Sequence, residues 1–230
     1  MSRVHVSIMR RALTVAATAI IAAGIAACGA PDYTYVKNSG EKTYFRVPAT
    51  WRQVDQAGLD YMTREDNPDS VSAQVRKRMT WSVAYDAHAE PTAAHLFSLT
   101  TTDEPIAYAK VVHLTEDQAN LVSFDALRNL FLPVSDSARA SAFEAGTLLP
   151  GFELLVDEVL TPSDGVRGVR VVYNYELPNG VLHTFDQTTY VNNDASVYYM
   201  LVIRCSARCY KARAGEIEGV ATSFTVRSKP

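Results

Sequence analysis

Cys205 and Cys209 are two residues whose type and spacing can support covalent or metal chemistry. They stand in the run Cys205-Ser-Ala-Arg-Cys209, and the chain has three cysteines in all. A cysteine pair in an exported chain favours a disulfide. Free thiols and a metal site remain as alternatives, although no histidine or further cysteine pair lies near enough in sequence to complete four ligands. The spacing is C-x₃-C rather than the redox C-x-x-C. We therefore expect a structural disulfide that joins a strand to the final helix.

Four histidines remain beyond the N-terminal segment: His88, His95, His113 and His183. None stands in a metal-binding spacing such as H-E-x-x-H, so we interpret each as a surface or hydrogen-bonded structural histidine. The sequence contains neither a G-x-S-x-G nucleophile motif nor a phosphate-binding G-x-x-x-x-G-K-[S/T] loop. Ser39-Gly40-Glu41-Lys42 fits the S-x-x-K pattern of penicillin-binding proteins, but the companion S-D-N and K-T-G elements are absent. The sequence therefore predicts no catalytic residues, no metal and no cofactor.

Cys28 ends the run Ile25-Ala26-Ala27-Cys28, which follows three arginines and an apolar stretch of 16 residues. That stretch is short for a bilayer span, which needs about 20 residues. These features are typical of a secretory signal, and the last four residues resemble the lipobox of bacterial lipoproteins, whose cysteine is diacylated and becomes the N-terminus. The resemblance implies a signal peptide over residues 1–27 and a protein held on the extracytoplasmic face of the cell membrane, because two acyl chains anchor a protein stably. We expect a lipidated tether over residues 28–42 and a single domain over residues 43–230.

The charge of the chain argues against nucleic acid as a partner. Without residues 1–27 it carries 19 Lys and Arg residues against 25 Asp and Glu residues, a formal charge of −6. Nucleic-acid-binding domains are basic, and electrostatic binding to lipid headgroups also needs basic clusters. The 16 arginines against six lysines, together with abundant alanine, are typical of a GC-rich genome such as that of an actinobacterium.

The first half of the expected domain mixes strands with one helix. Alternating or β-rich runs predict strands over Tyr44–Val47, Met79–Asp86 and Ile106–Leu114. Apolar residues at helical spacing predict one amphipathic helix over Asp117–Phe131, with Leu121, Phe124 and Leu127 on its core face. The acidic stretch Asp60–Ser72 lacks the spacing of a calcium loop and is expected to be a solvated loop.

The second half predicts an antiparallel meander. Apolar residues alternate along expected strands over Val169–Leu177, Leu182–Val191 and Val197–Ile203. Pro178-Asn179-Gly180 joins the first two strands, because Asn-Gly supplies the positive φ angles of a type I′ turn. A helix over Tyr210–Thr222 and a short strand over Ser223–Val226 follow. Gly215 and Gly219 in that helix predict close packing on the sheet, since glycine otherwise weakens a helix.

The order of these segments resembles that of PsbP-like or Mog1-like proteins, which include small bacterial lipoproteins. The resemblance covers residues 43–227 and rests on "YFRVPATW", "GVRGVRVVYNYELPNGVLHTFDQTTYV", "VYYMLVIRC" and "SFTV". It implies an α+β fold in which an antiparallel sheet is flanked by helices as an α/β/α sandwich. It also implies a binding or assembly role rather than enzyme activity. The chain matches none of the functional residues of the photosystem or GTPase-binding branches, so only the fold carries over.

The leading functional hypothesis is a lipid-anchored, non-enzymatic envelope protein that binds a partner protein or a ligand through its sheet or a helix face. Two alternatives remain, an atypical envelope hydrolase and a carrier of a small apolar ligand. The tyrosines of the meander bear on the carrier alternative, because they either pack in the core or line a groove. These are Tyr173, Tyr175, Tyr190, Tyr198 and Tyr199.

Overall fold

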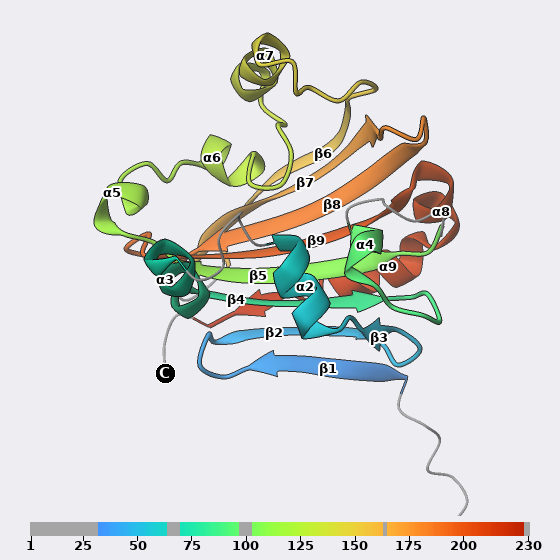
Figure 1. The fold of residues 1–230 in the computed structure, drawn as a ribbon, viewed down its shortest axis with the longest axis horizontal. Helices are drawn as coiled ribbons and strands as arrows, with labels where there is room; N and C mark the ends of the chain where they lie inside the picture. The colour runs from blue at the N-terminus through green and yellow to red at the C-terminus, as the bar shows by residue number, and fades with distance from the viewer. Residues whose placement is uncertain (1–31, 64–69, 97–102, 163–164, 228–230) are drawn as a thin grey trace, which may run out of the picture. The chain divides into compact units, whose positions relative to one another are not determined.

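The computed structural model describes residues 32–63, 70–96, 103–162 and 165–227. Their central element is a seven-stranded antiparallel sheet with the strand order β3-β4-β5-β9-β8-β7-β6 (Figure 1). Its strands are β3 (Arg52–Gln53), β4 (Thr80–Asp86), β5 (Ile106–His113), β6 (Glu153–Leu160), β7 (Arg167–Glu176), β8 (Leu182–Val191) and β9 (Val197–Ser206). The predicted meander is confirmed as β7, β8 and β9.

A smaller sheet and eight helices complete the described part of the chain. The small sheet contains β1 (Tyr33–Asn38), β2 (Thr43–Pro48) and β10 (Thr225–Val226). The helices are α2 (Gln56–Thr63), α3 (Val71–Met79), α4 (Ala93–Leu96), α5 (Glu116–Ala119), α6 (Phe124–Arg128), α7 (Asp136–Glu144), α8 (Ala207–Ala212) and α9 (Ala214–Ala221). Among the described residues, no helix has the length and apolar character needed to span a membrane.

Both faces of the central sheet are covered, because side chains along each strand alternate between two cores. On β9, Leu201 and Ile203 pack with the small sheet and α9, whereas Met200 and Val202 pack with residues of α2 and α4. Figure 1 shows α2 and α4 in front of the sheet. We call the two sides the α9 face and the α4 face. This arrangement confirms the predicted fold class, an α+β protein with an antiparallel sheet flanked by helices.

Strand β1 lies within residues 28–42, which the sequence predicts as a tether. Its six residues pair antiparallel with β2. Val36 is buried in the core, and the Tyr35 ring stacks on the Tyr44 ring with centroids 6.1 Å apart. The tether prediction is therefore wrong for residues 33–38, since this β-rich run finds a strand partner and a place in the core.

The helix expected over residues 117–131 is two short helices, α5 and α6. The Thr115 side chain caps α5 and the Ser123 side chain caps α6, each by accepting a backbone N–H of the first turn. The cap at Ser123 begins a new helix in the middle of the segment, so the apolar residues do not lie along one continuous helix. Leu127 is buried as predicted, but Leu121 is 76% exposed, and its placement on a core face is wrong.

Three further boundaries differ from the sequence prediction. The loop expected over Asp60–Ser72 is shorter, because α2 continues to Thr63 and α3 begins at Val71. The last helix is divided at Arg213 into α8 and α9. The final strand is confined to Thr225–Val226, at the end of the expected segment.

The turn between β7 and β8 is correctly placed but is not of type I′. That type needs positive φ at both central residues, whereas in this turn Gly180 has a φ of +75° and Asn179 does not have a positive φ. The Gly180 N–H donates to the Leu177 carbonyl at 2.8 Å. Pro178 suits the first central position of a type I turn, and Gly180 then supplies the left-handed residue that returns the chain to β8.

Gly215 and Gly219 in α9 are not explained by close packing. A Cβ at either position would meet no heavy atom within 4 Å. The prediction that these glycines allow a close approach to the sheet is therefore wrong, and both positions have room for a side chain.

We expect Gly219→Ala to raise the free energy of unfolding by about 0.5–1 kcal/mol, because alanine restricts the unfolded chain and favours the helix. Denaturant unfolding of the variant and of the unchanged protein measures the difference. A decrease in stability would contradict the open environment at this position.

We expect the same substitution at Gly168 on β7 to lower the free energy of unfolding by about 2–4 kcal/mol. A Cβ at Gly168 would lie 2.1 Å from the Thr189 carbonyl oxygen and 2.7 Å from Tyr190 Cδ1. Since the first of these atoms is backbone, β8 itself must shift. The two alanine variants therefore serve as controls for each other, and an unchanged or raised free energy of unfolding for Gly168→Ala would contradict the close approach of β8.

Candidate functional site

Arg204 on β9 is buried at one end of the central sheet, on the α4 face. Its Nε donates to the Leu96 carbonyl at 2.9 Å and its Nη2 to the His95 carbonyl. Its Nη1 donates to Nδ1 of His183 on β8 at 2.9 Å. Burial lowers the pKa of Arg204 to about 10, so the guanidinium remains charged at neutral pH. Arg204 thus satisfies carbonyls at the C-terminal end of α4, where a helix leaves its acceptors unpaired.

Asp86, the last residue of β4, is the buried acid of this cluster. Its Oδ2 lies 2.9 Å from His95 Nδ1, and its Oδ1 accepts the His88 backbone N–H at 2.8 Å. An aspartate paired with a histidine can orient a general base. The His95 ring is buried, however, and within the described ranges no hydroxyl or thiol is hydrogen-bonded to it. The contacts of Asp86 with His88 and His95 hold the 87–96 segment in place.

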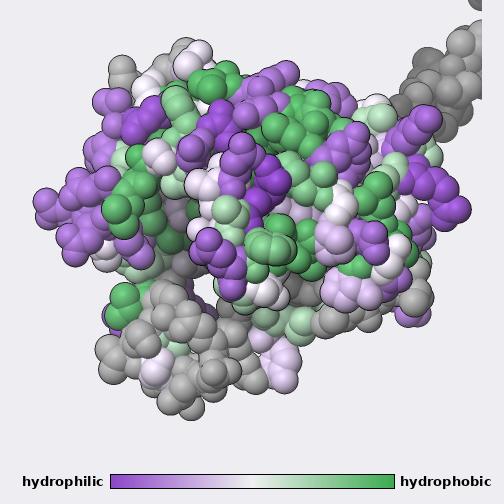
Figure 2. Space-filling model, turned by 90° about the horizontal axis from the view of Figure 1, so that it is seen from above, coloured by the Kyte–Doolittle hydropathy of each residue, from purple (hydrophilic) through white to green (hydrophobic). Residues whose placement is uncertain are grey.

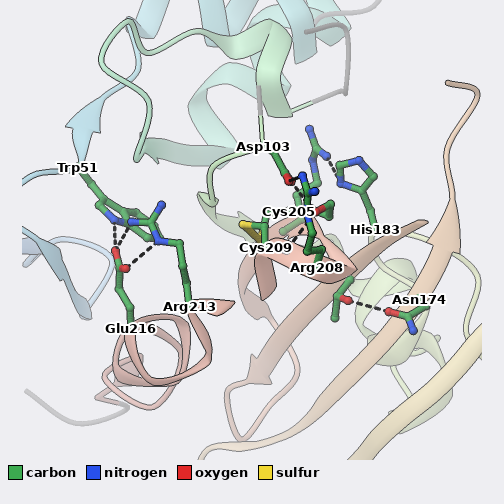
Figure 3. Close-up of a disulfide and its surroundings, with 12 residues drawn as sticks. Trp51, Asp103, Asn174, His183, Cys205, Arg208, Cys209, Arg213 and Glu216 are labelled. Carbon is green, nitrogen blue, oxygen red and sulfur yellow. Dashed lines mark hydrogen bonds and ion pairs between the residues drawn. A yellow bond between two sulfur atoms is a disulfide. The ribbon is translucent and has the colours of Figure 1, made fainter. Parts of the chain in front are cut away.

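The disulfide between Cys205 and Cys209 adjoins Arg204 at the same end of the sheet. It links the end of β9 to α8, with the two Cα atoms 5.9 Å apart, as the sequence predicts for a strand-to-helix link. Between the two cysteines, the Ser206 hydroxyl accepts the Cys209 backbone N–H at 3.1 Å and caps α8. Figure 3 shows the disulfide together with Asp103, which accepts a hydrogen bond from Arg208 at 3.1 Å.

A second charged cluster lies on the α9 face. Arg170 on β7 donates two hydrogen bonds to Asp186 on β8, at 3.0 and 2.8 Å, and its Nη1 donates to Glu218 on α9 at 2.9 Å. The Tyr210 hydroxyl of α8 also donates to Asp186, at 2.9 Å. The hydrogen bonds with Asp186 and then Glu218 raise the pKa of Arg170, and those from Arg170 lower the pKa of Glu218. The cluster therefore connects both C-terminal helices to the sheet.

Strand β6 forms an exposed edge of the central sheet. It has eight residues, whereas β3 at the other edge has two. Leu154, Leu155 and Val159 are 44%, 46% and 52% exposed. Figure 2 views the protein from the side on which α7 and β6 lie in Figure 1, and it shows hydrophobic residues at the surface among hydrophilic ones. Because an edge strand presents unpaired backbone N–H and C=O groups, this surface can bind another strand. We call residues 153–160 the β6 edge.

The histidines fall into two groups. His95 and His183 come together around Arg204, which the sequence analysis did not identify as a site residue. His113 lies elsewhere, with its Nε2 2.9 Å from a Glu41 carboxylate oxygen. Their interpretation as structural or surface residues fits these positions. Among the described residues, no group of three or more His, Cys, Asp or Glu side chains is arranged to hold a metal ion.

Two further candidates of the sequence analysis carry no described site. Ser39-Gly40-Glu41-Lys42 is the turn between β1 and β2 rather than part of a helix, so nothing aligns this serine with the lysine as in an acyl-transfer enzyme. Cys28 lies outside the described residues.

The tyrosines of the meander pack mainly in the core. Tyr173 and Tyr175 are fully buried, and Tyr199 is also buried. The Tyr173 ring stacks on Phe185 with centroids 5.5 Å apart. Tyr190 and Tyr198 are half-buried against the two cores. Tyr173 and Tyr175 therefore pack in the core and do not line a surface groove.

Sequence reasoning missed Arg204 and Asp86, which organise the cluster on the α4 face. Arg204 follows Leu201-Val202-Ile203 directly, and Asp86 ends the run Val83-Ala84-Tyr85. A charged residue inside an apolar strand must be paired or strongly hydrogen-bonded. The position of each residue directly after an apolar run could therefore have indicated a buried charge with partners. The sequence could not name the partners, because Leu96 and Arg204 are 108 residues apart in the chain.

Comparisons with known proteins found similar solved structures at low sequence identity. No family model matches the sequence, and no curated protein matches it. The structure is similar to cyanobacterial PsbP from Synechocystis, with 11% identity, coverage of 88% of this chain and 97% of that chain, and a TM-score of 0.48. It is also similar to LpqN of Mycobacterium tuberculosis, with 16% identity, coverage of 85% and 90%, and a TM-score of 0.44.

The yeast Ran-binding protein Mog1p is a third similar structure, with 10% identity, coverage of 86% of this chain and 96% of that chain, and a TM-score of 0.41. Identities of this size concern the general arrangement of strands and helices, and no function is carried over from them.

We expect the His183 environment to make stability depend on pH. Burial and the neighbouring Arg204 charge lower the pKa of His183 to about 4, whereas an unfolded histidine titrates near 6.5. Between these values the unfolded state binds more protons, so the free energy of unfolding falls as the pH decreases from about 6.5 to 4, by about 2 kcal/mol for this group once solvent screening is included. Denaturant unfolding across this range measures the slope.

His183→Gln should reduce this slope, because glutamine has no titrating proton while its amide oxygen can still accept the Arg204 N–H. His113→Gln, at a half-exposed position, is the matched control and should leave the His183 contribution in place. An unchanged slope in His183→Gln would contradict the assignment.

Proposed function

We propose that the protein is a lipid-anchored envelope protein on the extracytoplasmic face of the cell membrane, where it acts as a non-enzymatic binding or assembly module. The run that ends at Cys28, after an apolar stretch and three arginines, supports the anchor. The Cys205–Cys209 pair supports an oxidising compartment, since disulfides persist outside the cytoplasm.

The observation that carries the binding role is the contrast between the interior and the β6 edge. Arg204, Asp86, Arg170 and Asp186 are used in contacts within the fold. The β6 edge instead presents apolar side chains and a free strand edge to solvent. Chemistry at a charged centre would need an opening to substrate, whereas strand pairing needs only an accessible edge.

Cys28→Ala tests the anchor. The full chain should incorporate a clickable palmitate analogue in a bacterial host and sediment with membranes, and Cys28→Ala should lose the label and leave the membrane fraction. The reason is that acylation needs the cysteine thiol and stable anchoring needs the acyl chains. In-gel fluorescence of the fractions measures both.

The double variant Cys205→Ala, Cys209→Ala is the matched control, because it removes thiols outside the lipobox and should keep the label. Label retained in Cys28→Ala, or absent from the unchanged chain, would overturn the anchor.

For the binding role, the intact protein is purified from detergent-solubilised membranes. A stoichiometric partner that is lost after denaturation of the domain supports it, and recovery of lipid alone contradicts it.

A further inference from the structure

The β6 edge has a chemical character that specifies what can bind there. Its sequence, Glu-Leu-Leu-Val-Asp-Glu-Val-Leu, contains three acidic residues and no basic residue. Among the described strands, β6 pairs with β7 alone, so its other side is unpaired in the described part of the chain. The side chains Val181 and Leu182, at 41% and 38% exposure, extend the apolar surface beyond the β6 edge at the β7–β8 turn.

The three acidic residues of the β6 edge differ in their hydrogen-bond and ion-pair partners. Arg128 on α6 donates to both carboxylate oxygens of Asp157, at 2.9 and 3.0 Å, and Asn174 donates to Glu153 at 2.8 Å. Glu158 is exposed and lies opposite Arg170 in the β6–β7 register, but the hydrogen bonds of Arg170 go to Asp186 and Glu218, and Glu158 has no hydrogen bond or ion pair with another described residue. The register also shifts between Leu154 and Val156, so the stretch that can pair regularly runs from Val156 to Leu160 and contains Glu158.

A second copy of this chain is a poor occupant of the β6 edge. Two β6 strands side by side would bring the acids of each copy together, and of these acids only Asp157 has an ion-pair partner among the described residues, Arg128 from outside the strand. Like charges on neighbouring strands destabilise pairing. A strand with basic residues alternating with apolar ones has the opposite charge, and it can place aliphatic side chains against Leu154 and Val159, which are exposed.

We propose that the β6 edge binds an extended basic segment of another protein, which adds to the central sheet as an eighth strand. This inference rests on the proposed binding role and names the chemistry of the partner. Backbone hydrogen bonds to β6 would supply the pairing, and Glu158 would select lysine or arginine on the incoming strand.

The test uses the intact protein in detergent micelles and an eight-residue fluorescein-labelled peptide of alternating lysine and valine. Fluorescence anisotropy measures its affinity, and hydrogen–deuterium exchange locates it. We expect saturable binding with slower exchange at β6 and no change at β1, which is a strand of the other sheet. Glu158→Lys should weaken the affinity at least fivefold. Glu90→Lys makes the same charge change at an exposed loop residue before α4 and should have less than a twofold effect.

Two further peptides separate strand addition from simple charge attraction. A lysine–proline peptide has the same charge but lacks half of the backbone donors, and a glutamate–valine peptide has the opposite charge. Equal binding of either peptide, or binding without protection of β6, would overturn the proposal. Concentration-dependent dimers protected at β6 in the absence of peptide would also overturn it, because the occupant would then be a second copy.

The outcomes are distinct from those of the anchoring experiment. Loss of palmitate labelling leaves the peptide measurement unaffected, because the detergent-purified protein contains the β6 edge whether or not Cys28 is acylated. Absence of peptide binding by a normally labelled protein would remove the β6 edge as the binding surface and leave the anchor in place.

Discussion

The guanidinium of Arg204 has to be satisfied inside the protein, and this requirement organises one whole end of the central sheet. A buried charge without partners would cost several kcal/mol. Its donors therefore go to two carbonyls of α4 and to His183, while Asp86 reaches the cluster through His95. These contacts connect β4, β8 and β9 to a helix of four residues, which is too short to be stable alone. The disulfide then fixes α8 to the residue next to Arg204.

The second cluster applies the same principle on the other face. Arg170 is held by Asp186 and Glu218, and Tyr210 completes the set, so α8 and α9 are fixed to β7 and β8 by charge as well as by apolar packing. In both clusters the charged side chains form hydrogen bonds with other residues of the fold. Such closed networks specify where the helices lie on the sheet.

The parts of the fold that could be predicted are those where local pattern and tertiary packing agree. The meander could be predicted from the alternation along β7, β8 and β9 and from the Pro-Asn-Gly turn. Most residues of these three strands are buried, so packing supports the local pattern. Strand β6 was missed since its apolar residues do not alternate and a bulge interrupts its register. The break between α5 and α6 depends on the cap at Ser123, which competes with apolar spacing that would otherwise continue the helix. The contacts of Arg204 with α4 and of Arg170 with Glu218 could not be predicted, because their partners are 108, 109 and 48 residues away in the chain.

An anchored protein does not need a tight binding surface. Strand addition at an edge with a bulge gives modest affinity, because the incoming segment must lose its conformational freedom to pair. If Cys28 is acylated as proposed, both the protein and a membrane partner are confined to one surface, where effective concentrations reach the millimolar range for tethered pairs. Weak pairing at the β6 edge is then sufficient, and the same confinement raises the risk of self-pairing. The three acids of β6, with no base among them, oppose that self-pairing and admit a basic strand.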